Sequence, residues 1–216
     1  MKLQLASRNN EPVNKDISQI LADIHDPECQ LKARELLKVF KRNLELLRRG
    51  YLLLNESDYR SEVAKALNKA TQSLKIVATL DAESALESSG ELLALAYGVK
   101  ITRIFITDQQ HLLNPMTLKK LFKLHQAGID VQICFLTDLP AVNPTTPHST
   151  PYFAIYNDTL VTDQTFDSLH YFGKKTTNSN EVKKYRQLFE LIQTHSQAFA
   201  SERIQSQLQL INTLPI

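Results

Sequence analysis

Three aspartates stand where three apolar runs of this sequence end. The runs finish in TLD, ITD and LTD, which places Asp81, Asp108 and Asp138 directly after segments that read as strands. Because ligands of open α/β sheets usually bind at the carboxyl ends of the strands, these carboxylates could hold Mg²⁺ and, through it, a phosphorylated ligand. The alternative is structural: Asp81 caps the next helix, and the other two begin turns. We prefer the structural interpretation, because loop chemistry alone selects short acidic residues there, and we predict no metal and no cofactor.

A second segment of chemical interest covers residues 152–166 and reads YFAIYNDTLVTDQTF. It resembles the catalytic strand of the phospholipase D superfamily, whose half-site has the pattern H-x-K-x-x-x-x-D in strands such as HHKFAIIDGKVVLTGS. Aligning FAIY with FAII puts Thr150 at the histidine position, Tyr152 at the lysine position and Asn157 at the aspartate position. The resemblance therefore implies the fold of this superfamily without its catalytic residues.

The chemistry that the resemblance implies needs a nucleophilic histidine and a phosphate-holding lysine two residues apart on one strand face. None of the six histidines is followed by lysine two positions later. His148 lies nearest to the strand, in a segment rich in proline, threonine and serine that reads as a loop. We predict no catalytic residue, and Tyr152, Asn157 and His148 join the three aspartates as candidate ligand-binding residues. Superfamily members without the motif are known as sensory or recognition domains.

Basic side chains offer a third possibility, which is binding to the phosphates of a nucleic acid. Against it, Glu28, Glu35 and Glu45 interrupt the same helix, and charge opposite an apolar stripe usually only solvates a helix. The candidates are Arg34, Lys38, Lys41, Arg42, Arg48 and Arg49. A smaller basic group flanks the last predicted helix, either as an anion-binding surface or simply exposed: Lys174, Lys175, Lys183, Lys184 and Arg186.

The elements that must position these residues follow from apolar spacing. Helices are predicted near 17–24, from Pro27 to about Gly50, and from about Ser57. The second has an apolar stripe that steps by three or four residues: Ala33, Leu37, Phe40, Leu44, Leu47 and Tyr51. Since a small α/β domain can leave such a stripe partly uncovered, and superfamily half-units commonly pair, we predict a homodimer that involves this helix.

An internal repeat in the middle of the chain predicts the fold class. AYGVKITRIFITD at 96–108 matches QAGIDVQICFLTD at 126–138, and each copy reads as a helix end, a turn and a strand. Gly98 and Gly128 stand where a helix end needs a left-handed residue. Strands that are apolar on both faces are typical of covered parallel sheets. We therefore predict an α/β fold with a mixed, largely parallel sheet flanked by helices, a phospholipase D-like half-unit with an N-terminal helical extension.

The last third reads as a linker at 140–151 and a hairpin with strands at 153–156 and 159–162. A short apolar piece at 169–172 ends at Gly173, and a long helix begins near Asn180. The apolar stripe of that helix includes Tyr185, His195 and Phe199, which we interpret as core residues. The predicted units are the extension at 1–55, the α/β domain at 56–202 and a tail at 203–216.

Composition excludes several classes of protein. A formal charge of +2 gives no general attraction to nucleic acid or acidic membranes, two distant cysteines form no disulfide or zinc framework, and no run is apolar enough for a membrane span. We expect a cytoplasmic protein of bacterial type.

The predicted function is a non-catalytic binding or regulatory module that acts through a protein partner or small ligand, as a homodimer. The alternatives are a nucleic-acid scaffold that uses helix 27–49 and a metal-dependent phosphohydrolase that uses the aspartates.

Overall fold

A computed structural model of the chain describes residues 17–80, 89–108, 112, 114–139, 152–164 and 171–200. The chain divides into two compact units, Met1–Arg48 and Arg49–Ile216. In the described part of the first unit, a short helix at 17–22 precedes α2 (Pro27–Arg48), which begins at its proline as predicted. None of the residues of α2 is buried. No helix in the described ranges is long and apolar enough to cross a membrane.

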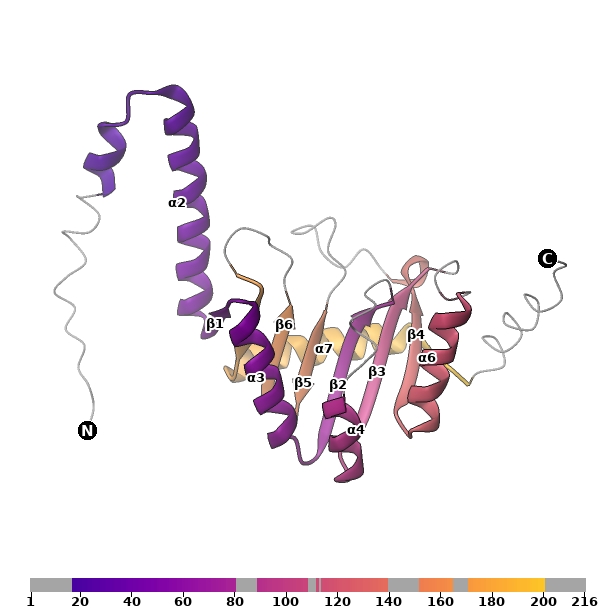
Figure 1. The fold of residues 1–216 in the computed structure, drawn as a ribbon. Coiled ribbons are helices and arrows are strands. Elements are labelled where there is room, and N and C mark those ends of the chain that lie inside the picture. Colours follow the sequence, from indigo (N-terminus) through magenta and orange to yellow (C-terminus); the bar gives the residue numbers. More distant parts are fainter. Residues whose placement is uncertain are drawn as a thin grey trace, which may run out of the picture. The chain divides into compact units, whose positions relative to one another are not determined.

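The second unit is an α/β domain built on one sheet (Figure 1). Its described helices are α3 (Glu56–Lys69), α4 (Ser89–Ala96), α6 (Pro115–Gln126) and α7 (Ser179–Thr194), with a short 3-10 turn at Leu136–Asp138. Its strands are β1 (Tyr51–Leu54), β2 (Ser73–Thr79), β3 (Lys100–Thr107), β4 (Asp130–Phe135), β5 (Phe153–Tyr156), β6 (Leu160–Gln164), β7 (Gly173–Thr176) and β8 (Ser196–Ala198).

The eight strands lie in the order β1-β7-β6-β5-β2-β3-β4-β8. Only the pairs β2–β3 and β3–β4 are parallel, and the other five described pairs are antiparallel. The α/β class and the mixed sheet are confirmed, but the prediction of a largely parallel sheet is wrong. The internal repeat covers only β3 and β4, which are parallel to each other, and β3 is also parallel to β2. Each remaining strand pairs antiparallel with its neighbours.

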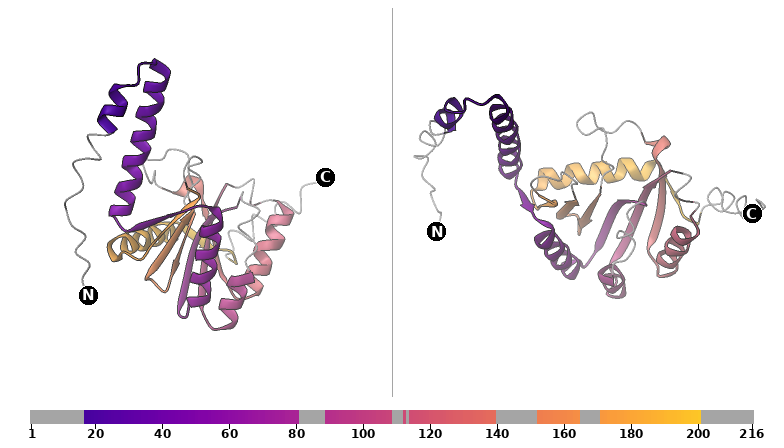
Figure 2. Two further views of the ribbon diagram at one scale, coloured as in Figure 1. Left: turned by 60° about the vertical axis from the view of Figure 1, so that its left-hand side comes forward. Right: turned by 45° about the horizontal axis from the view of Figure 1, so that its top comes forward.

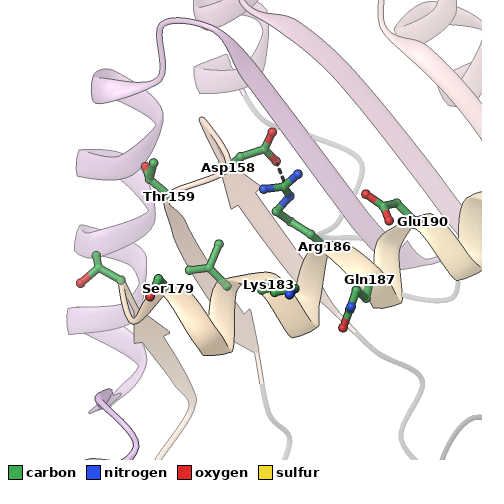
Figure 3. A pocket seen from close by; sticks show the side chains of 9 residues that line it. Asp158, Thr159, Ser179, Lys183, Arg186, Gln187 and Glu190 are labelled. Carbon is green, nitrogen blue, oxygen red and sulfur yellow. Dashed lines mark ion pairs between the residues drawn. The ribbon is translucent and has the colours of Figure 1, made fainter.

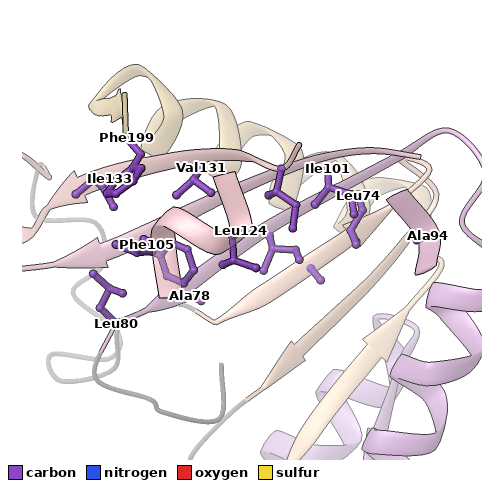
Figure 4. Close-up of a cluster of buried hydrophobic side chains, with 14 of the residues drawn as sticks. Leu74, Ala78, Leu80, Ala94, Ile101, Phe105, Leu124, Val131, Ile133 and Phe199 are labelled. Atoms are coloured by element: carbon purple, nitrogen blue, oxygen red, sulfur yellow. The ribbon is translucent and has the colours of Figure 1, made fainter. Parts of the chain in front are cut away.

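Helices cover both faces of this sheet (Figure 2). On one face α3, α4 and α6 contribute Ala66, Ala94, Leu121 and Leu124 to a core that includes Phe105 (Figure 4). On the other face α7 contributes a second set of buried side chains, namely Val182, Phe189 and Ile192, against Val77, Ile104, Cys134 and Ile155. Side chains alternate between the faces along each strand, so adjacent residues of β3 belong to different cores.

Several residues that predict helix ends, helix caps or turns adopt the predicted local structure. Gly98 and Gly128 have φ values of +85° and +97°, and each follows a helix. The side chain of Asn114 accepts a hydrogen bond from the Met116 N–H and so caps α6. Asn157 and Asp158 have φ values of +50° and +55°, which suit the two-residue turn of the β5–β6 hairpin.

The sequence interpretation missed three strands at the margins of the sheet. Tyr51 was placed on the apolar stripe of the preceding helix, but that helix ends at Arg48 and Tyr51 begins β1. Phe199 was placed on the last helix, yet α7 ends at Thr194, and the Phe199 N–H donates to the Val131 carbonyl beside β8. The short apolar piece predicted at 169–172 lies partly outside the described residues, and β7 begins at Gly173, where that piece ends.

Gly173 is the tightest glycine in the described domain, and its replacement is a test of packing. A Cβ there would lie 2.6 Å from Cε2 of Tyr59 and 2.9 Å from the Asp163 carbonyl oxygen. Because overpacking forces such atoms apart, Gly173→Ala is expected to lower the free energy of unfolding by about 1–3 kcal/mol. Urea unfolding measures this loss, and because Gly173 is not among the glycines with positive φ, backbone strain does not contribute to it. A loss of less than about 0.5 kcal/mol would contradict the packing argument.

Candidate binding cleft

Tyr152 lies beside a cleft between α3, the start of α4 and the ends of β5 and β6. Its position follows from the sheet, because the Gln164 N–H donates to the Tyr152 carbonyl and extends the hairpin by one pair. The cleft has a volume of about 350 Å³. Its lining is mainly apolar and aromatic, with two amides and one arginine: Tyr59, Arg60, Val63, Ala64, Leu67, Asn68, Gly90, Tyr152, Gln164 and Phe172.

A buried ion pair lies directly behind Tyr152. Arg103, in the middle of β3, is 1% exposed, and its Nη1 donates to both carboxylate oxygens of Glu91 on α4, at 2.9 and 2.7 Å. The guanidinium also lies 4.9 Å from the centre of the Phe105 ring. Its Nε is buried and makes no hydrogen bond to a described residue. Two charges are thus removed from water inside the core, an arrangement that requires both partners.

The electrostatics of this region keep Tyr152 neutral. Burial raises the pKa of its phenol, the nearby positive charge of Arg103 opposes that rise, and the negative charge of Glu91 reinforces it. The hydrogen-bonding capacity of the nearby Arg103 guanidinium also opposes the rise in the pKa of Tyr152. The position that resembles the phosphate-holding lysine of the superfamily therefore has an uncharged hydroxyl, and the positive charge behind it is already paired with Glu91.

Asn157, at the aspartate position of the resemblance, binds backbone atoms. Its Oδ1 accepts hydrogen bonds from the N–H groups of Thr71 and Gln72 at 3.0 and 2.9 Å, and its Nδ2 donates to the Lys69 carbonyl at 3.2 Å. These bonds hold the turn between α3 and β2 against the hairpin. Asn157 thus has a structural role in this fold, and contact with a ligand stays a prediction for it.

Only two of the other ligand-binding candidates lie in the described residues, after neighbouring parallel strands. Asp81 and His148 lie outside the described residues. Asp108 follows β3, and Asp138 ends the 3-10 turn after β4, where Thr137 donates to its Oδ1 at 3.3 Å. No group of three or more histidine, cysteine, aspartate or glutamate side chains that could hold a metal occurs in the part of the chain that the structure describes. A role for the aspartates in ligand binding stays a prediction.

The basic residues of the N-terminal third separate into two sets. Arg34, Lys38, Lys41, Arg42 and Arg48 lie on α2, and Arg48 donates to Glu45 at 2.7 and 2.9 Å. The sixth residue of the set, Arg49, belongs to the second unit, where its Nη2 lies 2.6 Å from Oε2 of Glu181. Arg49 is therefore an anchor of the α/β domain and does not continue the basic side of the helix.

Glu181 is the centre of a second polar network, at the start of α7. It accepts hydrogen bonds from Arg49, from the Tyr51 hydroxyl at 2.6 Å and from Lys184 at 2.7 Å. Glu181 is 5% exposed. The hydrogen bond from Arg49, with those from Lys184 and Tyr51, lowers the pKa of Glu181 to about 2, although burial opposes the shift.

This depressed pKa predicts a pH dependence of stability. A carboxyl whose pKa is lower in the folded state stabilises the protein above its unfolded pKa, near 4.5, and loses that contribution as the pH falls toward 2. We expect Glu181→Gln to lower the free energy of unfolding by about 2 kcal/mol at neutral pH, and the difference from wild type to shrink across this window. Urea unfolding at a series of pH values measures it. A difference that does not change with pH would show that the charge of Glu181 contributes nothing.

A second cavity lies between α7 and the β5–β6 turn and has a volume of about 520 Å³ (Figure 3). It is lined by Asp158, Thr159, Thr177, Ser179, Val182, Lys183, Arg186, Gln187 and Glu190. Asp158 pairs with Lys75 at 2.8 Å and with Arg186 at 3.7 Å. The basic group predicted near this helix is largely neutralised in the same way, since Lys174 pairs with Asp163 and Lys175 with Glu62. The region is therefore a network of ion pairs more than a free anion-binding surface.

Sequence reasoning identified Tyr152 but missed the groups around it. Arg103 carried one signal, because it interrupts the apolar run ITRIFIT between Ile101 and Phe105, on the strand face that both of these bury. Glu91 carried none, since an acidic residue in the first turn of a helix is usually explained by the helix dipole. The cleft itself depends on how α3 packs on the sheet, which local patterns do not specify.

Comparison with known proteins places the fold. No family model matches the chain, and no curated protein matches it. Among solved structures, Nuc from Salmonella typhimurium, a phospholipase D family member, matches with a TM-score of 0.50 and 11% identity, over 70% of this chain and 98% of that one. NucT from Helicobacter pylori matches with a TM-score of 0.47 and 15% identity, over 69% of this chain and 97% of that one.

TrmBL2, an archaeal chromatin protein with a novel mode of DNA binding, matches with a TM-score of 0.47 and 13% identity, over 87% of this chain and 67% of that one. The similarity to Nuc shows that the chain has a phospholipase D-like fold, and at such low identity it shows the fold alone.

Proposed function

We propose that this protein is a non-catalytic binding or regulatory module in which a phospholipase D-like fold has kept its cleft and lost its chemistry. The observation that carries the proposal is the environment of Tyr152. A neutral phenol stands at the lysine position, and the nearest guanidinium is buried and paired with Glu91. Phosphate transfer relies on fixed positive charge that is free to meet the developing charge, and this pair offers none.

The cleft remains suited to binding. Its volume falls within the range of about 300–1,000 Å³ that is typical of small-molecule sites, and its aromatic and apolar lining with a few polar groups is also typical. An assay with phosphodiester substrates tests the proposal, which predicts turnover at the level of buffer alone.

We further propose that the module is a homodimer that pairs through α2. Four large apolar side chains on one side of this helix are about half exposed: Leu36 at 53%, Phe40 at 48%, Leu44 at 49% and Leu47 at 49%. Most of the stability of a helix in a protein comes from packing its apolar face, and α2 leaves this face about half exposed. Leu37, Phe40, Leu44 and Leu47 repeat at alternating steps of three and four, the spacing of a two-helix seam.

Replacing a leucine in this seam is expected to separate the two copies. Each dimer that carries Leu44→Glu loses two buried leucines, worth about 3 kcal/mol together, which raises the Kd roughly hundredfold. Light scattering across a concentration series measures the change. Leu93→Glu, at a leucine of α4 that is 50% exposed, is the matched control and should leave the dimer intact. A wild-type protein that is monomeric at high micromolar concentration, with Leu37→Glu and Leu44→Glu still folded, would remove the homodimer from the proposal.

One observation favours nucleic-acid binding as a second candidate function. Arg34, Lys38 and Lys41 form no ion pair with any residue in the described ranges, and their spacing puts them on one side of α2. Three neighbouring free cations could contact successive phosphates without regard to base sequence. Binding of duplex DNA that falls steeply with salt and weakens in Lys38→Glu would favour this function over the first.

A further inference from the structure

The cleft beside Tyr152 contains aromatic rings that a flat ligand could contact. Tyr59 and Phe172 meet edge to face, with ring centres 5.5 Å apart and an interplanar angle of 64°. Tyr59 is buried and fixed over Gly173, whereas Phe172 is only partly buried. Val63 and Leu67 of α3 complete an apolar wall. A planar ring that enters here would replace water against aromatic and aliphatic carbon on several sides.

The cations around the cleft are committed to carboxylates. Arg60, at the rim, donates to Glu56 at 2.7 and 3.1 Å. Lys175 lies 2.5 Å from Glu62, and Arg103 lies 2.7 Å from Glu91. Arg60 is the cation of this set that lines the cleft, and all three are already paired with carboxylates, so the charge pattern does not favour an anionic ligand.

Two amides in the cleft are free to recognise a neutral ligand. The side chains of Asn68 and Gln164 line it and make no hydrogen bond to any residue that the structure describes. Each amide offers both a donor and an acceptor, which matches the alternating donor and acceptor edge of a nitrogen heterocycle. Gln164 is partly buried at the end of β6, where an amide gains more from such a partner than it would in open water.

We propose that this cleft binds an uncharged nitrogen heterocycle of the purine or pyrimidine type, held between the aromatic rings and the free amides, and that a phosphate on the ligand adds nothing to its affinity. The inference rests on the proposed function, since it assigns a ligand class to the same cleft. Stacking of a base on an aromatic side chain contributes about 1–3 kcal/mol and one amide contact about 1 kcal/mol, which together reach millimolar affinity. The heterocycle can be part of a nucleoside, of a nucleotide or of a nucleic acid with an exposed base.

Calorimetric titration of the full chain tests the inference. The ligands are adenosine, guanosine, cytidine and uridine, followed by adenosine monophosphate and inorganic phosphate. At least one nucleoside should bind, adenosine and its monophosphate should have Kd values within about threefold of each other, and phosphate should not compete. Gln164→Leu should weaken binding about tenfold through loss of one hydrogen bond. The control Gln187→Leu changes an amide of the other cavity and should have no effect.

Three results would overturn the inference: no heat from any nucleoside at millimolar concentration, tenfold tighter binding of the monophosphate, or full affinity in Gln164→Leu. None of these results bears on catalysis, so the proposed non-catalytic role would survive them. Conversely, hydrolysis of a phosphodiester would refute the proposed function and leave ring binding to be judged by the titrations.

Discussion

Glu91→Leu is expected to lower the free energy of unfolding by about 3–5 kcal/mol, the largest effect that we predict for any single substitution. The leucine leaves the guanidinium of Arg103, which is 1% exposed, without its carboxylate in the core. Phe105 and the Tyr152 hydroxyl remain beside the charge, but neither neutralises it. The cost is therefore that of an unpaired buried ion, and urea unfolding at neutral pH measures it.

A double variant separates the cost of the unpaired charge from the value of the pair. Glu91→Leu with Arg103→Met removes both charges and fills the space with apolar atoms, and replacements of this kind are often neutral or stabilising. We expect the double variant to recover most of the stability that Glu91→Leu loses. A double variant as unstable as the single one, or a single variant that loses less than about 1 kcal/mol, would show that the pair is not the element that holds this region together.

The parts of the fold that were predictable are those with strong local patterns. The repeat that places Gly98 and Gly128 at helix ends identified β3, β4 and the helices before them. The Asn157-Asp158 turn identified the β5–β6 hairpin, because few other residue pairs adopt two consecutive left-handed conformations. In both cases the backbone needs a positive φ, which few residue types adopt, so the position can be recognised in the sequence.

The marginal strands carried no such signature. β7 reads GKKT, and its two lysines extend to opposite faces, where Lys174 meets Asp163 and Lys175 meets Glu62. Charged residues at both faces hide the apolar alternation of a strand. β8 has only three residues and exists because β4 offers it an edge. These strands form only because they pair with neighbouring strands in the folded domain. Their pairs are antiparallel, which is one reason why most strand pairs in the described sheet are antiparallel.

The candidate site was predictable in part, for the same reason. Tyr152 could be identified because the adjoining FAIY strand resembles a known one. Arg103 and Glu91 are 12 residues apart in the sequence and belong to a strand and a helix whose contact depends on the whole domain. An ion pair that forms only when a distant strand and helix pack together leaves no periodic pattern and no motif in the sequence, so local sequence patterns do not predict it.

The second large effect that we predict is the absence of phosphodiester hydrolysis. The catalytic route of the superfamily that this fold resembles depends on one nucleophile. Loss of the nucleophile from an enzyme of this covalent kind costs on the order of 10⁶ in turnover, and the remaining rate comes from binding and charge stabilisation. With Tyr152 neutral and Arg103 paired, we expect most of that remainder to be lost too. A dimer would not restore it, because both copies would carry the same defect.

The most direct test of the proposal that this fold has lost its chemistry is an assay of turnover. It compares the wild-type protein with His148→Ala and with buffer, on a chromogenic phosphodiester and on single-stranded DNA. We predict rates at the buffer level for both proteins and both substrates. Turnover clearly above buffer in the wild type that disappears in His148→Ala would contradict this, and would show that a histidine outside the described residues completes a catalytic site.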